Sequence, residues 1–286
     1  VTCGVADYIS DCLNSLKLQS HKNIEVVVIE NSVNPSLLPR IKEVFPGATV
    51  EPLAGNASFS VSLNCGIDST RGEFILCLND DVVLERDFIR QALNGFVDEK
   101  VGMVSGKILR MGKRVIDSTG LSLSIFCTPK ERGYSKIDAG QFEEKGFIFG
   151  VSGCVALYRR KMLNAVKDEN GYFDSRFLMY YEDLDLCWRA NRKKWKAYYI
   201  PQAIAYHARG GSCRQPGGIG SSFARRYLDD RFYASLLRNR FLTLIKNENL
   251  PGFFLCLLPV IFYDLISLGY TIIFRPRAIR FIFRNR

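Results

Sequence analysis

One apolar run with an acidic end constrains the fold of this chain more than any other stretch. The run extends from Phe74 to Asn79, is almost unbroken, and is followed at once by Asp80 and Asp81. A run of this length is typical of a strand buried on both faces of a parallel sheet. Open α/β sheets bind ligands at the carboxyl ends of their strands, so the two acids fall where a ligand would bind.

These residues leave two interpretations of the acidic end open. Adjacent carboxylates are costly to desolvate unless a cation lies beside them. Oxygen-rich clusters suit Mg²⁺ or Mn²⁺, and these ions in turn suit a diphosphate. The sequence Asn79-Asp80-Asp81 is also good turn chemistry, however, and a turn requires no metal.

The first 84 residues alternate strands with helices. This alternation predicts an α/β fold with a Rossmann-like, doubly wound and mostly parallel central sheet flanked by helices. The expected strands cover residues 24–29, 49–53 and 74–79, and the expected helices cover 6–18, 35–45 and 59–69. Residues 1–3 are typical of the end of a strand whose beginning is missing, so we expect a cropped N-terminus.

The middle of the chain is less regular. A helix is expected over residues 88–96 and a strand over 101–111, and residues 113–145 have the composition of an excursion or lid. Residues 147–158 form an apolar segment that glycines interrupt. Isolated glycines in a strand mark either a close approach to a ligand or a bulge, and both interpretations stay open.

A second acidic cluster follows an aromatic run. Glu182, Asp183 and Asp185 come directly after residues 176–181, and we expect a helix to begin near Glu182. The free N–H groups and the macrodipole of a helix start favour acids, so the cluster needs no catalytic explanation. The apolar approach favours instead a cleft in which one carboxylate serves as a general base. His207, which follows a strand expected over 195–201, is either a structural residue or a ligand.

The end of the chain is basic and apolar. A net charge of +10 suits nucleic acid, a phosphorylated ligand or an anionic membrane surface. Arginines alternate with bulky aliphatic residues over 275–286, which favours a membrane surface over nucleic acid. Residues 250–274 are apolar but broken by Pro251, Pro259 and Asp264, which favours an interfacial helix over a simple spanning one. Packing of 250–274 on the domain as an ordinary hairpin is the alternative. Nine scattered cysteines without a C-x-x-C pair indicate a reducing compartment.

Taken in order, these motifs resemble the family 2 glycosyltransferases of GT-A fold, particularly bacterial rhamnosyltransferase-like members that build cell-surface polysaccharide. The resemblance covers about residues 1–215. It rests on the order and spacing of segments 1–4, 28–32, 56–67, 78–81, 151–153, 181–189 and 206–212. Asn79 departs from the family pattern, since many relatives have there the first acid of an Asp-x-Asp motif.

The resemblance assigns roles to individual residues. It implies that Asp183 is the general base and that Asp81 and His207 bind Mg²⁺ or Mn²⁺. It also implies a set of substrate-binding residues: Thr2, Glu30, Asn56, Asn64, Asp80, Ser152, Gly153 and Glu182. The implied partners are a dTDP- or UDP-sugar donor and a lipid-linked saccharide acceptor.

We therefore expect a GT-A domain over residues 1–215 and a helical, membrane-associating tail over 216–286. The expected function is inverting transfer of a sugar, by family analogy rhamnose, at the cytoplasmic face of the inner membrane, with peripheral attachment and no nucleic-acid partner. One rival is a sugar-phosphate nucleotidyltransferase, which the absence of a glycine-rich, basic loop after the first strand counts against. The other is a catalytically inactive, membrane-bound assembly protein, which the joint presence of Asp81, Asp183 and His207 counts against.

Overall fold

The central sheet carries every element that later forms the site. The computed structural model describes residues 1–2, 6–32, 34, 36–53, 57–112, 114–209, 228–247 and 250–282. The sheet has the strand order β3-β10-β5-β11-β4, and β6 and β9 add to β5 and β11. Its strands are β3 (Phe74–Leu78), β4 (Val82–Leu84), β5 (Val101–Arg110), β6 (Ile116–Ser118), β9 (Gly146–Ile148), β10 (Val155–Arg159) and β11 (Lys196–His207).

The predicted α/β fold with a central sheet flanked by helices is confirmed, and its strand directions are more mixed than the mostly parallel sheet that was expected. Strand β11 runs parallel to β5, whereas β10 is antiparallel to both β3 and β5, and β4 is antiparallel to β11. The reason is that β5, β10 and β11 come from the part of the chain after residue 84, where strands and helices no longer alternate. The alternation that predicted parallel pairing therefore does not apply to them.

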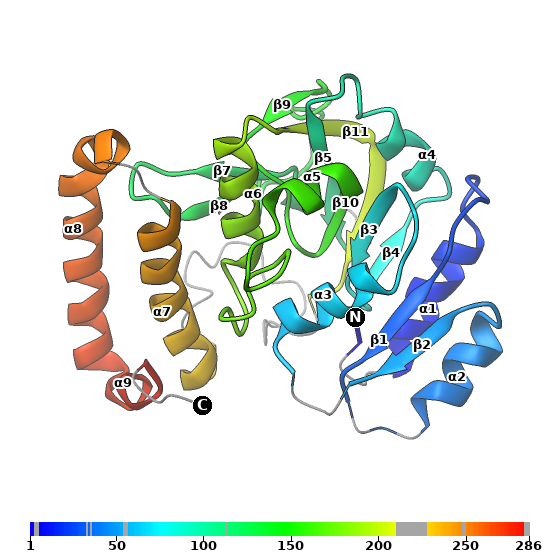
Figure 1. Cartoon of the computed structure of the whole chain (residues 1–286), viewed down its shortest axis with the longest axis horizontal. Helices are drawn as coiled ribbons and strands as arrows, with labels where there is room; N and C mark the ends of the chain where they lie inside the picture. The colour runs from blue at the N-terminus through cyan, green and yellow to red at the C-terminus, as the bar shows by residue number, and fades with distance from the viewer. Residues whose placement is uncertain are drawn as a thin grey trace.

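Helices cover both faces of this sheet (Figure 1). On one face lie α3 (Phe59–Asp68), α5 (Arg160–Val166) and α6 (Glu182–Arg192), whose apolar side chains pack against those of β3, β5 and β10. On the other face lies α4 (Phe88–Leu93), which buries Phe88, Ile89 and Ala92. Burial of each such side chain contributes about 1.5–3 kcal/mol, so the two layers hold the sheet between them.

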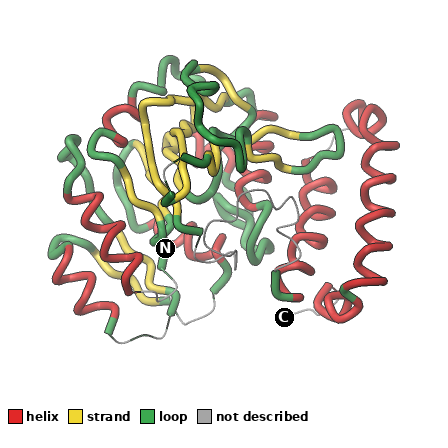
Figure 2. Tube along the Cα trace, turned by 180° about the vertical axis from the view of Figure 1, so that it is seen from behind, coloured by secondary structure: helices red, strands yellow, loops and turns green. Residues whose placement is uncertain are grey.

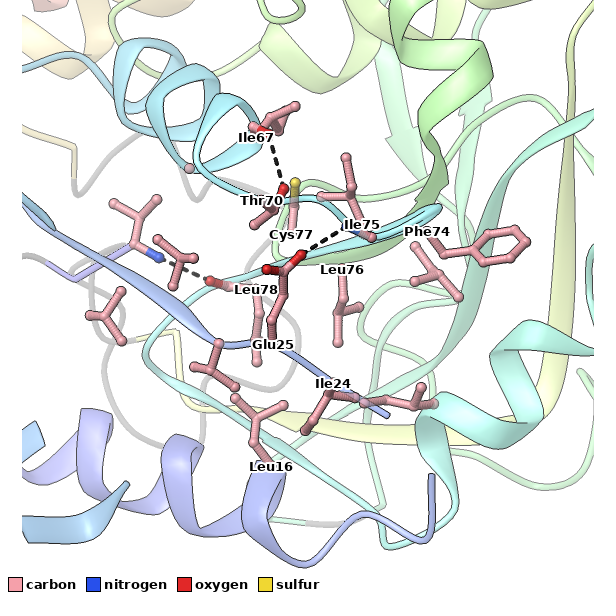
Figure 3. Close-up of a pocket in the computed structure, with 18 of the residues that line it drawn as sticks. Leu16, Ile24, Glu25, Ile67, Thr70, Phe74, Ile75, Leu76, Cys77 and Leu78 are labelled. Carbon is pink, nitrogen blue, oxygen red and sulfur yellow. Dashed lines mark hydrogen bonds between the residues drawn. The ribbon is translucent and has the colours of Figure 1, made fainter. Parts of the chain in front are cut away.

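The N-terminal part forms a smaller, parallel pair of strands. Strands β1 (Val27–Glu30) and β2 (Thr49–Pro52) pack with α1 (Ala6–Lys17) and α2 (Leu37–Val44). A cavity of about 780 Å³ separates β1 from β3, and aliphatic side chains such as those of Leu16, Ile24 and Leu76 line it (Figure 3). At one end of this cavity Val1 donates to the carbonyl of Leu78 at 3.2 Å, so the first residues join the two sheets.

The segment that the sequence suggested to be an excursion or lid contains three short strands. Strand β6 extends the central sheet, and β7 (Leu121–Leu123) and β8 (Pro129–Glu131) form a hairpin. The hairpin projects toward the C-terminal helices, as the view from behind shows (Figure 2). At its tip the ring of Phe126 stacks on Tyr263 with centroids 5.6 Å apart. Its short strands carry little periodicity, which explains why the sequence pattern missed them.

Three C-terminal helices form a separate layer beside the domain: α7 (Asp230–Asn247), α8 (Leu250–Phe274) and α9 (Pro276–Ile282) (Figure 1). Helix α8 continues through Pro259, and Asp264 faces α7, where it forms an ion pair with Arg240 at 2.5 Å. The stretch Cys256–Phe274 is long and apolar enough to cross a membrane, and only 11% of it is buried. Its outward face exposes Leu258, Ile261, Phe262, Leu265, Ile266, Leu268, Ile272, Ile273 and Phe274.

Candidate active site

Antiparallel pairing of β4 with β11 brings Asp81 and His207 together. The pairing places Val82 opposite His207, and the N–H of Ala208 donates to the carbonyl of Asp81 at 2.9 Å. As a result Nε2 of His207 lies 3.3 Å from Oδ1 of Asp81, and both side chains are buried. The two residues predicted to bind a metal are therefore neighbours, although 126 positions separate them in the chain (207 − 81).

Asp117 binds the other nitrogen of the His207 ring. Its Oδ2 lies 2.8 Å from Nδ1 of His207, and Nε of Arg209 donates to its Oδ1. Burial would raise the pKa of Asp117, but the hydrogen bond from His207 and the charge of Arg209 hold that pKa below its ordinary value. Burial would lower the pKa of His207, yet Cys154, Asp117 and Asp81 together raise it well above its usual range.

These residues fit a divalent cation. Two ligands in adjacent octahedral positions, each about 2.1 Å from the ion, lie roughly 3 Å apart, which is close to the separation of Asp81 and His207. The ligand-type atoms of Asp117, Cys154 and His207 also lie within 4.8 Å of one another. Because His207 and Arg209 already occupy both oxygens of Asp117, we assign this carboxylate to orienting the imidazole rather than to holding the ion.

The second acidic cluster meets the first because β3 pairs with β10. Leu78 lies opposite Val155, and the N–H of Asn79 donates to the carbonyl of Cys154 at 3.0 Å. This places Gly153 beside the loop of the first cluster, where its N–H donates to Oδ2 of Asp183 at 3.0 Å. The predicted base at the start of α6 thus binds the backbone that precedes β10, next to the segment that leads from β3 to Asp80 and Asp81.

Gly153 is needed for this approach. A Cβ atom added there would lie 3.3 Å from Cβ of Asp183 and 3.4 Å from its Oδ2. A side chain at position 153 would therefore require Asp183 to shift by a few tenths of an ångström. Gly153 therefore approaches a side chain of the protein itself, and the two interpretations of the interrupting glycines, approach to a ligand or a bulge, stay predictions.

Glu182 and Asp183 form a pair of carboxyls in an apolar setting at the start of α6. Burial raises the pKa of Asp183, while backbone N–H groups of Gly153 and Leu184 lower it, the latter donating at 2.7 Å. Burial and the neighbouring Asp183 raise the pKa of Glu182 to about 8. Among the described residues, Oε2 of Glu182 has no hydrogen-bond partner although the side chain is only 6% exposed. A buried polar atom in this state is a ready acceptor or donor for a ligand.

Glu131 is a third carboxyl that the sequence did not indicate. Ser152 donates to its Oε1 at 2.8 Å, and Ser118 donates to its Oε2. Burial raises the pKa of Glu131 to about 7, and Asp183 contributes in the same direction. Both Glu131 and Asp117 fall in the segment expected to be an excursion. The turn at Met111–Gly112 was a signal in the sequence that could have pointed to Asp117, because a hairpin there returns the chain along β5.

Two consecutive tyrosines before the acidic pair adopt left-handed backbone conformations. Tyr180 and Tyr181 both have φ of 72°. For residues with side chains this region costs about 1–2 kcal/mol each. Such strain persists only where surrounding contacts hold it, and it clusters at functional sites.

The remaining residues that were predicted to bind substrate come from the N-terminal part of the chain. Thr2 forms a parallel bridge with Glu30, whose carboxylate accepts from the N–H of Ser32 at 2.7 Å. Asp80 is half-buried and lines the cavity beside β3. Both ends of the Asn64 amide bind the backbone of Phe173, at 2.7 and 2.9 Å, so it anchors a loop. Asn56 lies outside the described residues.

Comparison with known proteins decides the family. The sequence profile described as Glycosyl transferase family 2 matches residues 1–167, which is more than half of the chain. This chain belongs to glycosyl transferase family 2. It is 23% identical over 211 residues to a poly-beta-1,6-N-acetyl-D-glucosamine synthase of Staphylococcus aureus, covering 70% of this chain and 47% of that protein. The chain thus spans about half the length of the curated relatives that it matches.

Solved structures place this family 2 chain in the expected GT-A fold. A mannosyltransferase from Pyrobaculum calidifontis, solved with GDP-Man and Mn²⁺, matches with a TM-score of 0.58 and 18% identity over 98% of this chain and 70% of its own. GalNAc-T7 with UDP, GalNAc and Mn²⁺ matches with a TM-score of 0.57 and 12% identity, over 80% of this chain and 44% of its own. Staphylococcus aureus TarS matches with a TM-score of 0.53 and 13% identity, over 85% of this chain and 38% of its own. The rhamnosyltransferase-like subtype stays a prediction.

Proposed function

We propose that this chain is an inverting glycosyltransferase that moves a sugar from a nucleoside-diphosphate donor to a saccharide acceptor. The observation that carries the proposal is the meeting of two carboxylate groups from opposite halves of the domain. Asp81 and His207 lie 3.3 Å apart, and Asp183 is bound to the N–H of Gly153, the residue before Cys154, whose carbonyl binds the N–H of Asn79.

Asp183 would act as the general base. It would accept the proton of the acceptor hydroxyl as that oxygen bonds to the anomeric carbon and the bond from this carbon to the diphosphate breaks. Efficient bases have a pKa near the working pH. Burial moves the pKa of Asp183 in that direction, and the backbone N–H groups of Gly153 and Leu184 hold its two oxygens in place.

Asp81 and His207 would hold Mg²⁺ or Mn²⁺. Bound there, the ion supplies positive charge that neutralises the departing nucleoside diphosphate. The mannosyltransferase and GalNAc-T7 named above were both solved with Mn²⁺ and a nucleotide, which supports a divalent cation in this fold. Asp117 keeps Nδ1 of His207 engaged and so directs Nε2 toward Asp81.

The substrate contacts follow the two sides of this arrangement. Thr2, Glu30, Asn56 and Asp80 would contact the nucleotide sugar, a dTDP- or UDP-sugar and by family analogy one carrying rhamnose. Asn64, whose amide binds the backbone of Phe173, would line the pocket by anchoring that loop. Ser152, Gly153 and Glu182 would contact the acceptor beside the base. The name of the staphylococcal relative, a poly-N-acetylglucosamine synthase, supports a role in polysaccharide synthesis.

Residues 216–286 would form a tail that holds the enzyme at the cytoplasmic face of the inner membrane, where the acceptor is a lipid-linked saccharide. The exposed apolar face of α8 and the exposed Arg277 and Arg280 of α9 support contact with an anionic surface. Peripheral attachment is supported by the inward face of α8. Asp264 binds Arg240 and Thr271 binds Tyr233, so side-chain contacts join the second half of α8 to α7.

A thermal-shift panel tests the function. The full chain is heated with UDP, dTDP or GDP, each with Mn²⁺, Mg²⁺ or a chelator. A ligand that binds the native state alone raises the unfolding midpoint, by an amount that grows with its concentration over Kd. We expect a metal-dependent shift with one nucleoside diphosphate, which also names the donor class. A shift with nucleoside triphosphates only would favour a nucleotidyltransferase, and no shift with any nucleotide would favour an inactive assembly protein.

A further inference from the structure

The chain enters α6 through a backbone conformation that it would not adopt by itself. Tyr180 and Tyr181, both with φ of 72°, directly precede Glu182 and Asp183. Left-handed conformations are disfavoured for residues that carry a Cβ atom. The direction in which α6 presents Asp183 therefore depends on contacts from elsewhere in the protein.

Asn239 of α7 makes such a contact. Its amide Nδ2 donates to the carbonyl of Met179 at 2.9 Å and to the carbonyl of Tyr180 at 2.8 Å. The side chain is fully buried. The opposite orientation of the amide would place its oxygen against two carbonyl oxygens, so the two donations fix how this side chain lies. Phe232, also on α7, adds an edge contact to the ring of Tyr180 with centroids 6.4 Å apart.

The same helix holds α6 on the far side of Asp183. Asn247 donates to Oδ1 of Asp185 at 2.8 Å, and Lys246 lies 3.2 Å from Oδ2 of Asp185 and 2.5 Å from Oδ2 of Asp174. Asp185 and Asp174 are fully buried, and hydrogen bonds to such carboxylates are stronger than those between neutral groups. Helix α7 thus contacts the chain both before and after Asp183.

We propose that Asn239 is a positioning residue, which holds the Tyr180–Tyr181 bend so that Asp183 meets the N–H of Gly153 and faces the acceptor. Helix α7 is then part of the catalytic apparatus, as well as the beginning of the membrane-associating tail. This inference rests on the proposed function in its assignment of Asp183 as the base. The statement that Asn239 orders the bend is independent of that assignment.

Hydrogen exchange on the full chain tests the ordering. Asn239→Leu removes both donations at similar side-chain size, and Asn239→Asp keeps the shape but sets a carboxylate against two carbonyls. The control is Thr243→Val, one turn further along α7, which loses only a hydroxyl bonded to the carbonyl of Asn239. We expect amide exchange over residues 180–184 to rise at least about tenfold in whichever Asn239 variants fold, and to change less than about twofold in the control. Equal exchange in all proteins would overturn the proposal.

Kinetics test the positioning. Release of nucleoside diphosphate is measured from UDP-N-acetylglucosamine, dTDP-rhamnose or GDP-mannose. Misplacement of a catalytic group by 1 Å costs on the order of 10² in rate, so we expect Asn239→Leu to lower kcat by about 30- to 100-fold while KM for the donor changes less than about threefold. The base limb of the pH profile should move upward, because Asp183 loses the N–H group that stabilises its carboxylate. The positioning role would be overturned if Asn239→Leu lost kcat and donor binding to the same extent, or if its loss of kcat were no larger than that of Thr243→Val.

The two proposals fail in different ways. If nucleotides give no shift and the unsubstituted protein transfers no sugar, the proposed function is wrong. If Asp183→Asn transfers sugar as the unsubstituted protein does, the assignment of Asp183 as the base is wrong. In both cases hydrogen exchange still decides whether Asn239 orders the bend. If Asp183→Asn is inactive while Asn239→Leu keeps its kcat and pH profile, only the positioning role is wrong.

Discussion

Replacing Glu182 by Gln should make the free energy of unfolding less dependent on pH. Burial and the neighbouring Asp183 raise the pKa of Glu182 to about 8, whereas the ordinary value for the unfolded chain is 4.5. Below pH 4.5 both states hold the proton. Between pH 4.5 and 8 the folded state keeps it and the unfolded state loses it, so unfolding releases a proton and stability falls as the pH rises.

The magnitude follows from the difference between the two pKa values. The shift is 8 − 4.5, or 3.5 pH units, and each unit corresponds to about 1.36 kcal/mol, which gives an upper bound of about 5 kcal/mol. About 4 kcal/mol of this is lost by pH 8, where half of the folded molecules still hold the proton. Gln has the shape of the protonated acid and does not titrate. We therefore expect Glu182→Gln to match the unsubstituted protein near pH 5 and to be more stable than it by several kcal/mol at pH 8.

Urea denaturation at pH 5, 6, 7 and 8, followed by circular dichroism, measures this difference. Linear extrapolation gives the free energy of unfolding at each pH for both proteins. Glu144→Gln, at an exposed position, is the matched control and should give a curve parallel to that of the unsubstituted protein. If the Glu182→Gln curve also runs parallel, within about 1 kcal/mol across the range, the raised pKa argued for Glu182 is refuted.

Three further predictions concern the site and the tail. Asp183→Asn should lower kcat by roughly 10²–10⁴ while nucleotide binding stays nearly intact, and a variant that retains most of its transfer activity would remove Asp183 as the base. Asp81→Ala should abolish the metal-dependent part of nucleoside-diphosphate binding, so that thermal shifts with Mn²⁺ and with chelator become equal; unchanged metal dependence would contradict the ligand role. Arg240→Met should destabilise the protein by roughly 3 kcal/mol in chemical denaturation, because it leaves Asp264 unpaired against α7, and adding Asp264→Leu should recover most of the loss. If the losses of stability of the two single variants add up in the double variant, Arg240 and Asp264 do not stabilise each other.

The sequence predicted well those features that depend on neighbouring residues. Apolar runs and helical periodicity located β3, α1 and α6, since burial of one strand or one helix face leaves a pattern in consecutive positions. Asp80 and Asp81 follow the end of β3, as expected from the point at which the apolar run ends. The helix start at Glu182 followed from acids after an aromatic run, and the structure places it there.

Features that depend on pairing between distant segments were less accessible. Strand directions in the central sheet differ from the expected pattern because β10 and β11 return from the second half of the chain, and periodicity carries no information about partners. Asp117 and Glu131 were missed because short strands leave a weak pattern. Asp117 lies 90 positions from His207, whose ring it holds.

The sequence by itself determined the longer strands and helices, the two acidic clusters and the basic, apolar end of the chain, because each is a property of consecutive residues. Only the tertiary structure decided which of these groups meet. The β4–β11 and β3–β10 pairings bring Asp81 to His207 and the backbone of Gly153 to Asp183. Packing of α7 against the start of α6 then brings Asn239 to a bend 59 positions away. Hydrogen bonds of this kind form between surfaces that exist only once the strands and helices have assembled.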